Sequence, residues 1–454
     1  MVDRTNEHTQ LTTNRTTAAY LAECLDVRSG LRSAGLTADF STVLSAKVAK
    51  RVFPRPLFVD NAEIQQFTDD ACRIFDLITS LPSRLFDNDL QQYCAALRIP
   101  RPWQPLLVRL GGGRPPLHGR ADMYHDGSSF KLLEFNIESN LGGLDRTGEI
   151  PRKFLEVDAF AAFAAKHNLA YTHTGELIAN MLRELGSQVS DGREPTIVML
   201  DGPGGLADYG WHSESVGQLM RRCGLDFHVG ELDEVEERGR HLTFRGMRVD
   251  VVLRDFSAHQ VATDPVAMSC AELIFRKHEE REVMLWTPLE STLFSNKGCM
   301  AMLSDPRFRH TFSPDEAALV DRLIPWTRAI NSDVASDVLE ECREYKDEIM
   351  LKPNWLFGGT GIVAGWECDD RAWNEALRVA SYYGYVAQRR VVPKREPVVD
   401  PISGAIEDWE ATWGLFLTPK GYAGVSARML PVGAGAVISI TANARTRAAG
   451  VFTT

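Results

Sequence analysis

The sequence has no long hydrophobic run and no apolar leader. None of its apolar stretches approaches the roughly 18 residues that a membrane span needs, and residues 1–17 are polar, unlike a signal peptide. The eight cysteines are scattered, without a Cys-x-x-Cys pair, which is typical of a reducing compartment. These absences predict a cytoplasmic protein that does not bind membranes.

The sequence also lacks an excess of positive charge. Its 50 Lys and Arg residues stand against 61 Asp and Glu, a formal net charge of −11. This charge argues against a nucleic-acid binder, so any bound phosphate must be held by a local cluster of cations. With 454 residues, 44% of them hydrophobic, the chain can bury a large core and is expected to form about two or three lobes.

One apolar β-pattern, at residues 132–137, is interrupted by the oxygen-bearing side chains of Glu134 and Asn136. Being two positions apart, they project from the same face of a strand. The turn signal Asp126-Gly127 predicts a hairpin that brings Asp122 alongside them. Two carboxylates and an amide would leave uncompensated negative charge unless a cation lies between them, and hard oxygen ligands suit Mg²⁺. The alternative is a solvated hairpin face.

Two lysines lie where a phosphate would explain them. Lys297 is in the first turn of a predicted helix that Ser295 or Asn296 can cap, and a cation there is unfavourable unless an anion is close. Lys352 ends an apolar strand that runs into the glycine-rich residues 358–361, where the backbone could approach a polyphosphate. A solvated lysine and a flexible hairpin tip are the alternatives.

Three other polar residues lie on predicted strands. Gln388 is at the centre of a strand within residues 384–393, Arg254 ends the strand at 249–254, and Arg428 ends another. Arg254 could anchor a carboxylate through its bidentate fork or form a structural ion pair. Arg428 could reach a phosphate or acyl-phosphate oxygen, or be an ordinary edge-strand arginine.

A second glycine-rich turn, at residues 202–207, follows an apolar strand at 196–201. Its G-x-G-x-x-A spacing is that of a dinucleotide-binding turn. Residues 209–212 delay the predicted helix to 214–223, so the glycines are not expected to open it. The sequence therefore favours an α/β crossover loop over an NAD site.

Taken together, these stretches resemble the ATP-grasp superfamily, and within it the glutathionylspermidine synthetase-like group. In that group the metal-binding half of the site precedes the nucleotide-binding half, a circularly permuted order. The matching stretches fall within roughly 105–450 and are residues 120–122, 131–136, 293–297, 351–361, 385–393, 411–428 and 440–441. The resemblance implies an α/β (α+β) ATP-grasp fold with a helical N-terminal segment and a small α/β layer.

The resemblance also implies roles for individual residues. Asp122, Glu134 and Asn136 would be Mg²⁺ ligands, and Arg120 would contact the γ-phosphate of ATP and the transferring group. Lys297 and Lys352 would hold the α- and β-phosphates, and Gln388 would lie at the adenine hinge. The glycines of the lid over the phosphates would be Gly358, Gly359 and Gly361.

Two segments depart from the pattern of the group. Residues 137–143 replace its Ala-Asp-Thr/Ser motif, and residues 441–445 lack its aromatic–Pro-His ending. Both face the acceptor side, so polyamine and glutathione are not supported as substrates.

The expected organisation has five parts. These are a disordered tail at 1–16, a helical region at 17–104, a metal-binding part at 105–190 that opens with a strand at 105–110, a small α/β substrate domain at 191–290, and nucleotide-binding lobes at 291–454 whose final sheet includes a strand at 436–441.

The predicted function is that of an ATP-dependent carboxylate–amine ligase that forms an amide through an acyl phosphate, joining an amino acid to a small acid in natural-product biosynthesis. A ligase that loads an amino acid onto a carrier-protein thiol, a non-catalytic ATP-binding protein and an NAD oxidoreductase are the alternatives. The partners are small-molecule carboxylates and amines, and a homodimer is compatible with the sequence.

Overall fold

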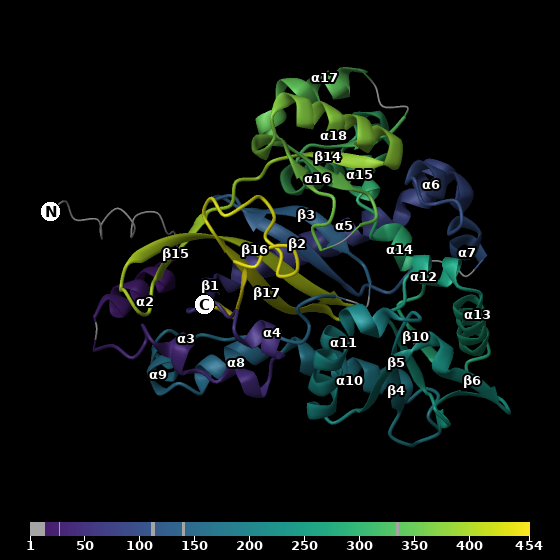
Figure 1. Cartoon of the computed structure of the whole chain (residues 1–454), viewed down its shortest axis with the longest axis horizontal. Coiled ribbons are helices and arrows are strands. Elements are labelled where there is room, and N and C mark those ends of the chain that lie inside the picture. The colour runs from purple at the N-terminus through teal and green to yellow at the C-terminus, as the bar shows by residue number, and fades with distance from the viewer. Residues whose placement is uncertain (1–13, 27, 110–113, 139–140, 333–335, 357) are drawn as a thin grey trace.

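The computed structural model describes residues 14–26, 28–109, 114–138, 141–332, 336–356 and 358–454. Figure 1 shows a lobe above a central sheet, with helical and α/β layers below it. Most of the predicted disordered tail lies outside the described residues. Helix α2 (Arg15–Leu25) already covers its last two residues, and the Asn14 side chain accepts a hydrogen bond from the backbone of Thr17 at the start of this helix.

The central sheet joins the predicted hairpin to strands near the end of the chain. Its order is β18-β17-β16-β2-β3, with β15 pairing with β16, and all its pairs are antiparallel. Its strands are β2 (Gly119–His125), β3 (Phe130–Asn136), β15 (Arg395–Val399), β16 (Ile406–Thr418), β17 (Gly421–Pro431) and β18 (Arg447–Ala449). The long helix α5 (Asn61–Phe86) packs on this sheet through Phe67 against Phe130 and Phe75 against Phe135.

The upper lobe is a four-stranded antiparallel sheet with helices around it (Figure 1). Its strand order is β11-β14-β12-β13, with bounds Thr327–Ile330, Tyr385–Arg389, Ile349–Pro353 and Val363–Ala364. Its helices are α15 (Gly298–Ser304), α16 (Pro314–Leu323), α17 (Ser336–Glu344) and α18 (Asp370–Tyr383). The hairpin of β12 and β13 brackets the glycine-rich residues 358–361, as predicted.

The predicted small α/β layer is present as a parallel sheet of order β10-β9-β4-β5. Its strands are β4 (Thr196–Asp201), β5 (Asp226–Glu231), β9 (Val251–Arg254) and β10 (Met284–Trp286). Its helices are α10 (Thr174–Gly186), α11 (Gly205–Arg222), α12 (Ala258–Thr263) and α13 (Pro265–Glu279). An antiparallel sheet of β6 (Val235–Arg238), β7 (His241–Phe244) and β8 (Met247–Arg248) adjoins it.

The N-terminal region is mainly helical, as predicted, with two differences. The expected strand at 105–110 is wrong, because helix α7 (Gln104–Arg109) buries Leu106 and Leu107; a short apolar run fits either element, and proline is favoured in a first helical turn. Strand β1 (Leu57–Val59) was not expected and pairs in parallel with β19 (Val451–Thr453). The remaining helices are α3 (Ala34–Thr37), α4 (Ala46–Ala49), α6 (Leu90–Ala96), α8 (Glu149–Leu155), α9 (Asp158–Lys166) and α14 (Ser291–Phe294).

The strand expected at residues 436–441 is also wrong. This segment forms no strand and instead lines a cavity between the central sheet and the upper lobe. The apolar character that resembled a strand faces that cavity and the glycine-rich loop, where Gly359 lies against Val437. None of the helices in the described part of the chain has the length and apolar character that crossing a membrane requires.

Candidate active site

The hairpin of β2 and β3 brings the three predicted metal ligands together. Asp122 is the cross-strand partner of Glu134, and Arg120 is the partner of Asn136. The register shifts beside Asp122, which leaves Leu133 without a partner on β2 and forms a bulge of the kind that re-aims side chains near functional sites. The unpaired carbonyl of Leu133 instead accepts a hydrogen bond from Gln388 Nε2 at 3.3 Å. The predicted clustering is therefore present.

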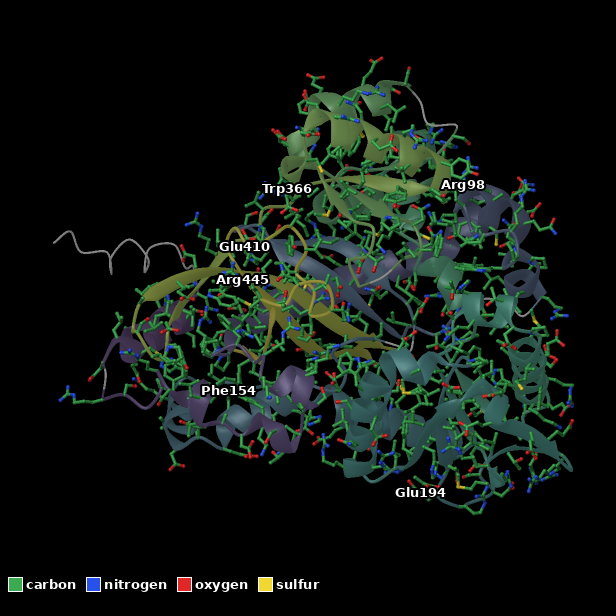
Figure 2. The ribbon with its side chains drawn as sticks, viewed as in Figure 1. Arg98, Phe154, Glu194, Trp366, Glu410 and Arg445 are labelled. Atoms are coloured by element: carbon green, nitrogen blue, oxygen red, sulfur yellow. The ribbon has the colours of Figure 1, made fainter. Side chains whose placement is uncertain are left out.

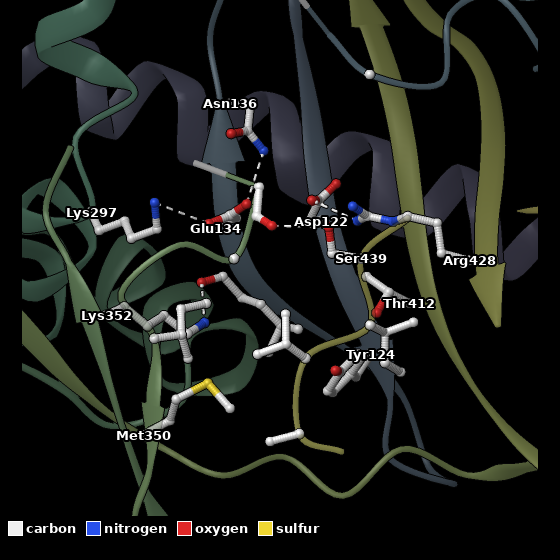
Figure 3. A pocket seen from close by; sticks show the side chains of 18 of the residues that line it. Asp122, Tyr124, Glu134, Asn136, Lys297, Met350, Lys352, Thr412, Arg428 and Ser439 are labelled. Atoms are coloured by element: carbon white, nitrogen blue, oxygen red, sulfur yellow. Dashed lines mark hydrogen bonds and ion pairs between the residues drawn. The ribbon is translucent and has the colours of Figure 1, made fainter. Parts of the chain in front are cut away.

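The two predicted lysines face the same hairpin from the upper lobe (Figure 3). Lys297 Nζ lies 3.3 Å from Glu134 Oε2 and donates to the carbonyl of Leu356 at 2.8 Å. Lys297 is itself the N-cap of α15, and no side chain of the described residues caps this helix as predicted, although the Asn296 side chain accepts from the Gly298 N–H at 2.8 Å. The anion that makes a cation acceptable at this helix start is, within the protein, Glu134.

Lys352 reaches the site from β12. Its Nζ donates to Gln388 Oε1 at 2.6 Å and lies 3.5 Å from the carbonyl of Leu133. Gln388 also donates to Thr327 Oγ1 at 3.1 Å, so its side chain positions Lys352. Because the side-chain amide of Gln388 is already hydrogen-bonded within the protein, the predicted contact with adenine would have to come from the backbone of β14.

Asp122 is held by two arginines rather than left uncompensated. Arg120 forms a two-pronged pair with it at 2.5 and 2.8 Å, and Arg428 Nη2 donates to Asp122 Oδ2 at 2.8 Å. Figure 3 shows Arg428 extending from β17 to this carboxylate. Arg428 lies inside β17 (Gly421–Pro431) rather than at its end. The sequence argument that a metal must neutralise these carboxylates is therefore wrong, because four cationic side chains of the protein surround them.

Burial and the neighbouring charges together shift the pKa values of Glu134 and Lys352. Burial would raise the pKa of Glu134, but Lys297, Lys352 and Arg120 outweigh burial and hold that pKa well below its ordinary value. Burial lowers the pKa of Lys352 to about 8, although the Glu134 carboxylate opposes the change. Glu134 is thus a carboxylate at neutral pH, and Lys352 is a cation that loses its proton in mildly alkaline solution.

These side chains line a cavity of about 600 Å³ between the central sheet and the upper lobe. This volume falls in the range of roughly 300–1,000 Å³ that is common for small-molecule sites. Trp366 of the upper lobe and Glu410 of the central sheet, both labelled in Figure 2, are among its lining residues. The lining includes seven Lys or Arg and five Asp or Glu side chains, so it is locally cationic in an acidic protein. Such a cavity favours an anionic ligand.

The glycine-rich loop borders this cavity beside residues 436–441. Gly358, Gly359 and Gly361 all have positive φ, from 68° to 88°, the left-handed region that glycine adopts without strain. The carbonyl of Gly358 accepts a hydrogen bond from Ser439 Oγ at 2.9 Å. Gly358 and Gly359 line the cavity, whereas Gly361 packs against Pro353 and Tyr385.

Arg254, like Gly361, lies outside the cavity lining. It is buried and donates to the carbonyls of Thr287 and Phe256 and to Ser291 Oγ, at 2.8–2.9 Å. The bonds to Thr287 and Ser291 join β9 to the start of α14 and the segment before it. The structure thus places Arg254 among structural contacts, and its predicted catalytic role stays a prediction.

The second glycine-rich turn differs from its prediction. Helix α11 begins at Gly205, directly at the glycines, so the expected delay to residue 214 is wrong. The Glu231 carboxylate accepts from the N–H groups of Gly204 and Leu206 at 2.9 and 3.1 Å. A carboxylate from the neighbouring strand thus already occupies the position where a pyrophosphate would bind, which disfavours the NAD interpretation.

Several cavity residues were missed from the sequence. They are Tyr124, Glu138, Arg146, Trp366 and Ser426. Tyr124 lies two residues after Asp122, so strand periodicity could have placed it on the same face. Arg146 follows the Gly142-Gly143 pair closely, but nothing in its local pattern separates it from a surface arginine. Residues 139 and 140 of the departing 137–143 segment lie outside the described residues.

Comparisons with known proteins bear on the fold. No protein-family model matches the chain, and no curated protein matches it. Among solved structures, the chain is similar to a glutathione synthetase-like effector from Globodera pallida in its apoform, with a TM-score of 0.56 and 13% identity over 98% of this chain and 99% of that chain.

Two more solved structures are less similar. One is a putative gamma-glutamylcysteine synthetase from Methylobacillus flagellatus, with a TM-score of 0.42 and 12% identity over 83% of this chain and 88% of that chain. The other is D-alanyl-alanine synthetase A from Vibrio cholerae, with a TM-score of 0.32 and 13% identity over 57% and 74%. Both scores are too low to support an argument about this chain.

The likeness to the glutathione synthetase-like effector confirms the predicted mixed α/β fold. The circularly permuted order, the particular group and the five segment boundaries stay predictions.

Proposed function

We propose that the protein is an ATP-dependent carboxylate–amine ligase of the ATP-grasp type. The observation that carries this proposal is the cavity in which the hairpin side chains Glu134 and Asn136 face Lys297 and Lys352 of the upper lobe. A triphosphate needs cations on one side and, when it carries Mg²⁺, oxygen ligands on the other. In this cavity, cations and oxygen ligands from distant parts of the sequence face each other in that arrangement.

The residues present fit Mg²⁺ only in part. Glu134 and Asn136 offer hard oxygens beside an anion-favouring cavity, and Mg²⁺ is usually held by one or two carboxylates together with substrate phosphates. The Asp122 carboxylate accepts three hydrogen bonds from arginines, so only one lone pair, on Oδ1, is left for a metal. No cluster of three His, Cys, Asp or Glu side chains suited to a metal occurs within the described residues, so the proposed set depends on the Asn136 amide and on phosphate oxygens.

In the proposed reaction the substrate carboxylate attacks the γ-phosphorus of ATP, the bond to the bridging oxygen breaks, and ADP leaves. The amine then attacks the acyl phosphate, inorganic phosphate leaves, and the nitrogen loses a proton. Mg²⁺, when bound, would offset negative charge on the phosphates. Lys297 and Lys352 would hold phosphate oxygens, and Arg120 would orient the transferring group.

The products we propose are amides between an amino acid and a small acid, formed in natural-product biosynthesis. The proposal rests on positioning and charge neutralisation, without a protein nucleophile. Transfer to a carrier-protein thiol would use the same activation chemistry, with a thiolate in place of the amine.

The test measures ADP release from wild type and Glu134→Ala with a panel of carboxylic acids and amines, and identifies products by mass. We expect at least one acid–amine pair to release ADP with wild type, to yield the mass of the condensed product, and to give no release with the variant. ATP binding without ADP release for any pair would contradict the ligase assignment and favour a nucleotide-binding protein.

A further inference from the structure

Arg146 differs from the four cations that surround Asp122 and Glu134 in this cavity. It is only 9% exposed, and its Nε and Nη1 atoms are buried without a hydrogen-bond partner. Arg120, Arg428, Lys297 and Lys352 all donate to acceptors within the protein. Buried N–H donors without acceptors are unfavourable, so these two atoms of Arg146 are suited to an acceptor from outside the protein.

The carboxylate of Asp145 lies beside Arg146 and balances its charge, but it does not form a hydrogen bond with the guanidinium group. Asp145 Oδ1 lies 3.2 Å from Arg146 Nε, but that oxygen is itself buried without a hydrogen-bond partner. Asp145 Oδ2 accepts from Ser215 Oγ at 2.9 Å, which ties the carboxylate to α11. The donors of Arg146 therefore remain available to an external acceptor.

The space beside Arg146 is kept open by glycine. A Cβ atom on Gly143, whose φ is +104°, would lie 3.5 Å from Ser426 Oγ and 3.8 Å from Arg146 Nε. A Cβ atom on Gly414 would lie 3.1 Å from the same hydroxyl and 2.8 Å from Arg120 Cδ. The Ser426 hydroxyl thus lies near both glycines, of which Gly414 is next to Arg120 and Gly143 is next to Arg146.

We propose that Arg146 and Ser426 form a carboxylate-binding subsite for the acid substrate, beside Arg120 and apart from the phosphate-binding lysines. A guanidinium matches a carboxylate by two parallel hydrogen bonds. The Ser426 hydroxyl, which now donates to the carbonyl of Gly414 over 3.4 Å, can turn to the same carboxylate as a third donor. This inference rests on the proposed ligase function and assigns the part of the cavity where the acid binds.

The test measures direct binding in the presence of Mg²⁺ and the β,γ-imido analogue of ATP. The probes are acetate, succinate, glutarate and L-glutamate, with succinamide as the uncharged match. The proteins are wild type, Arg146→Gln, Arg146→Lys and, as a charge-matched control, Arg28→Gln, whose side chain is 90% exposed. Titration calorimetry gives the dissociation constants of the probes and of the ATP analogue.

We expect at least one carboxylate, but not succinamide, to bind wild type and Arg28→Gln equally. Its affinity should fall at least tenfold in Arg146→Gln and by less in Arg146→Lys, which keeps the charge but not the fork. The affinity for the ATP analogue should stay the same in all four proteins, which also shows that the variants are folded. A loss for acetate as well as for the diacids assigns Arg146 to the reacting carboxylate, and a loss for the diacids alone assigns it to a second, anchoring carboxylate.

Three results would overturn the subsite. They are equal carboxylate affinity in wild type and Arg146→Gln, loss of affinity for the ATP analogue instead of the carboxylate, and no carboxylate binding to wild type. ADP release separates this proposal from the ligase assignment. Carboxylate binding that depends on Arg146, without ADP release, would support the subsite and contradict the ligase function. ADP release with an unchanged KM for the acid in Arg146→Gln would support the ligase function and contradict the subsite.

Discussion

The chain contains two glycine-rich turns that each follow an apolar strand, and their surroundings give them different uses. At residues 202–205, the Glu231 carboxylate accepts from the backbone N–H groups of Gly204 and Leu206. At residues 358–361, the loop follows the strand that carries Lys352 and borders a cavity with an excess of cations. The N–H groups of the first turn already donate to a carboxylate of the protein, whereas the second turn borders a cavity that favours an anion.

This comparison shows that glycine spacing alone does not identify a phosphate site. Glycine allows the backbone to approach a ligand, but the neighbouring charges determine whether binding of an anion is favourable. A carboxylate at a helix start is stabilising in its own right and excludes the phosphate that the motif would otherwise bind. Lysines beside the other loop have the opposite effect. The following changes test this contrast, in order of expected effect.

The largest effect is expected for Glu134→Gln, which keeps the size of the side chain but removes its charge. The lysines at the second loop then lose their carboxylate partner, and Mg²⁺ would lose a ligand. ADP release should fall by about a thousandfold, the scale of a lost metal clamp. Steady-state kinetics measure the fall, and a decrease of less than tenfold would contradict the role given to the hairpin.

Lys352→Met and Glu231→Gln compare the two turns directly. Lys352→Met should weaken binding of the ATP analogue by about 10- to 100-fold, since hydrogen bonds to charged groups contribute about 1.5–3 kcal/mol. Glu231→Gln should leave that affinity unchanged and lower the free energy of unfolding by about 1 kcal/mol, the scale of a lost helix cap. Calorimetric titration and urea denaturation measure the two effects. Equal losses of ATP affinity in both variants would remove the distinction between the turns.

The pKa of about 8 at Lys352 predicts a pH dependence for ATP binding. Bound phosphate favours the protonated lysine and raises its pKa, so binding above pH 8 must take up a proton. Affinity should be flat below that pH and fall by up to about tenfold per pH unit above it. Lys352→Arg should stay flat to pH 9, because arginine remains charged. An equally steep fall in this variant would assign the titration to another group.

The smallest effects are expected from a matched pair of glycine substitutions. Gly359→Ala and Gly204→Ala both place a Cβ at positive φ, which costs roughly 1–2 kcal/mol of stability. The new Cβ at Gly359 would also lie 2.6 Å from Val437, whereas that at Gly204 meets open space. Only Gly359→Ala should raise the KM for ATP, by several-fold. A comparable rise in Gly204→Ala would count against a separate role for the second loop.

Short-range sequence patterns were enough to predict the hairpin and to single out the two lysines. Glu134 and Asn136 alternate along one strand, and Asp126-Gly127 marks the turn, so their clustering required no knowledge of distant contacts. Lys297 and Lys352 were conspicuous because each lies at the boundary of a regular element. The mixed α/β fold was expected from the family resemblance that these stretches carry.

Long-range contacts were not accessible in this way. Nothing near Asp122 indicates that Arg428 pairs with it, because that contact depends on β16 lying between β2 and β17. The apolar segment at 436–441 has a strand's composition but lies against the cavity, and β1 pairs with a strand at the far end of the chain. Arg146 is recognisable only once the burial of its unsatisfied donors is known.

A crystal structure of the protein with Mg²⁺ and the β,γ-imido analogue of ATP tests the central claim most directly. We predict that the triphosphate lies between the Glu134–Asn136 side of the hairpin and the lysines at 297 and 352, with the glycine-rich loop over it. A nucleotide bound at residues 202–205, or one whose phosphates lie out of reach of both lysines, would contradict the account.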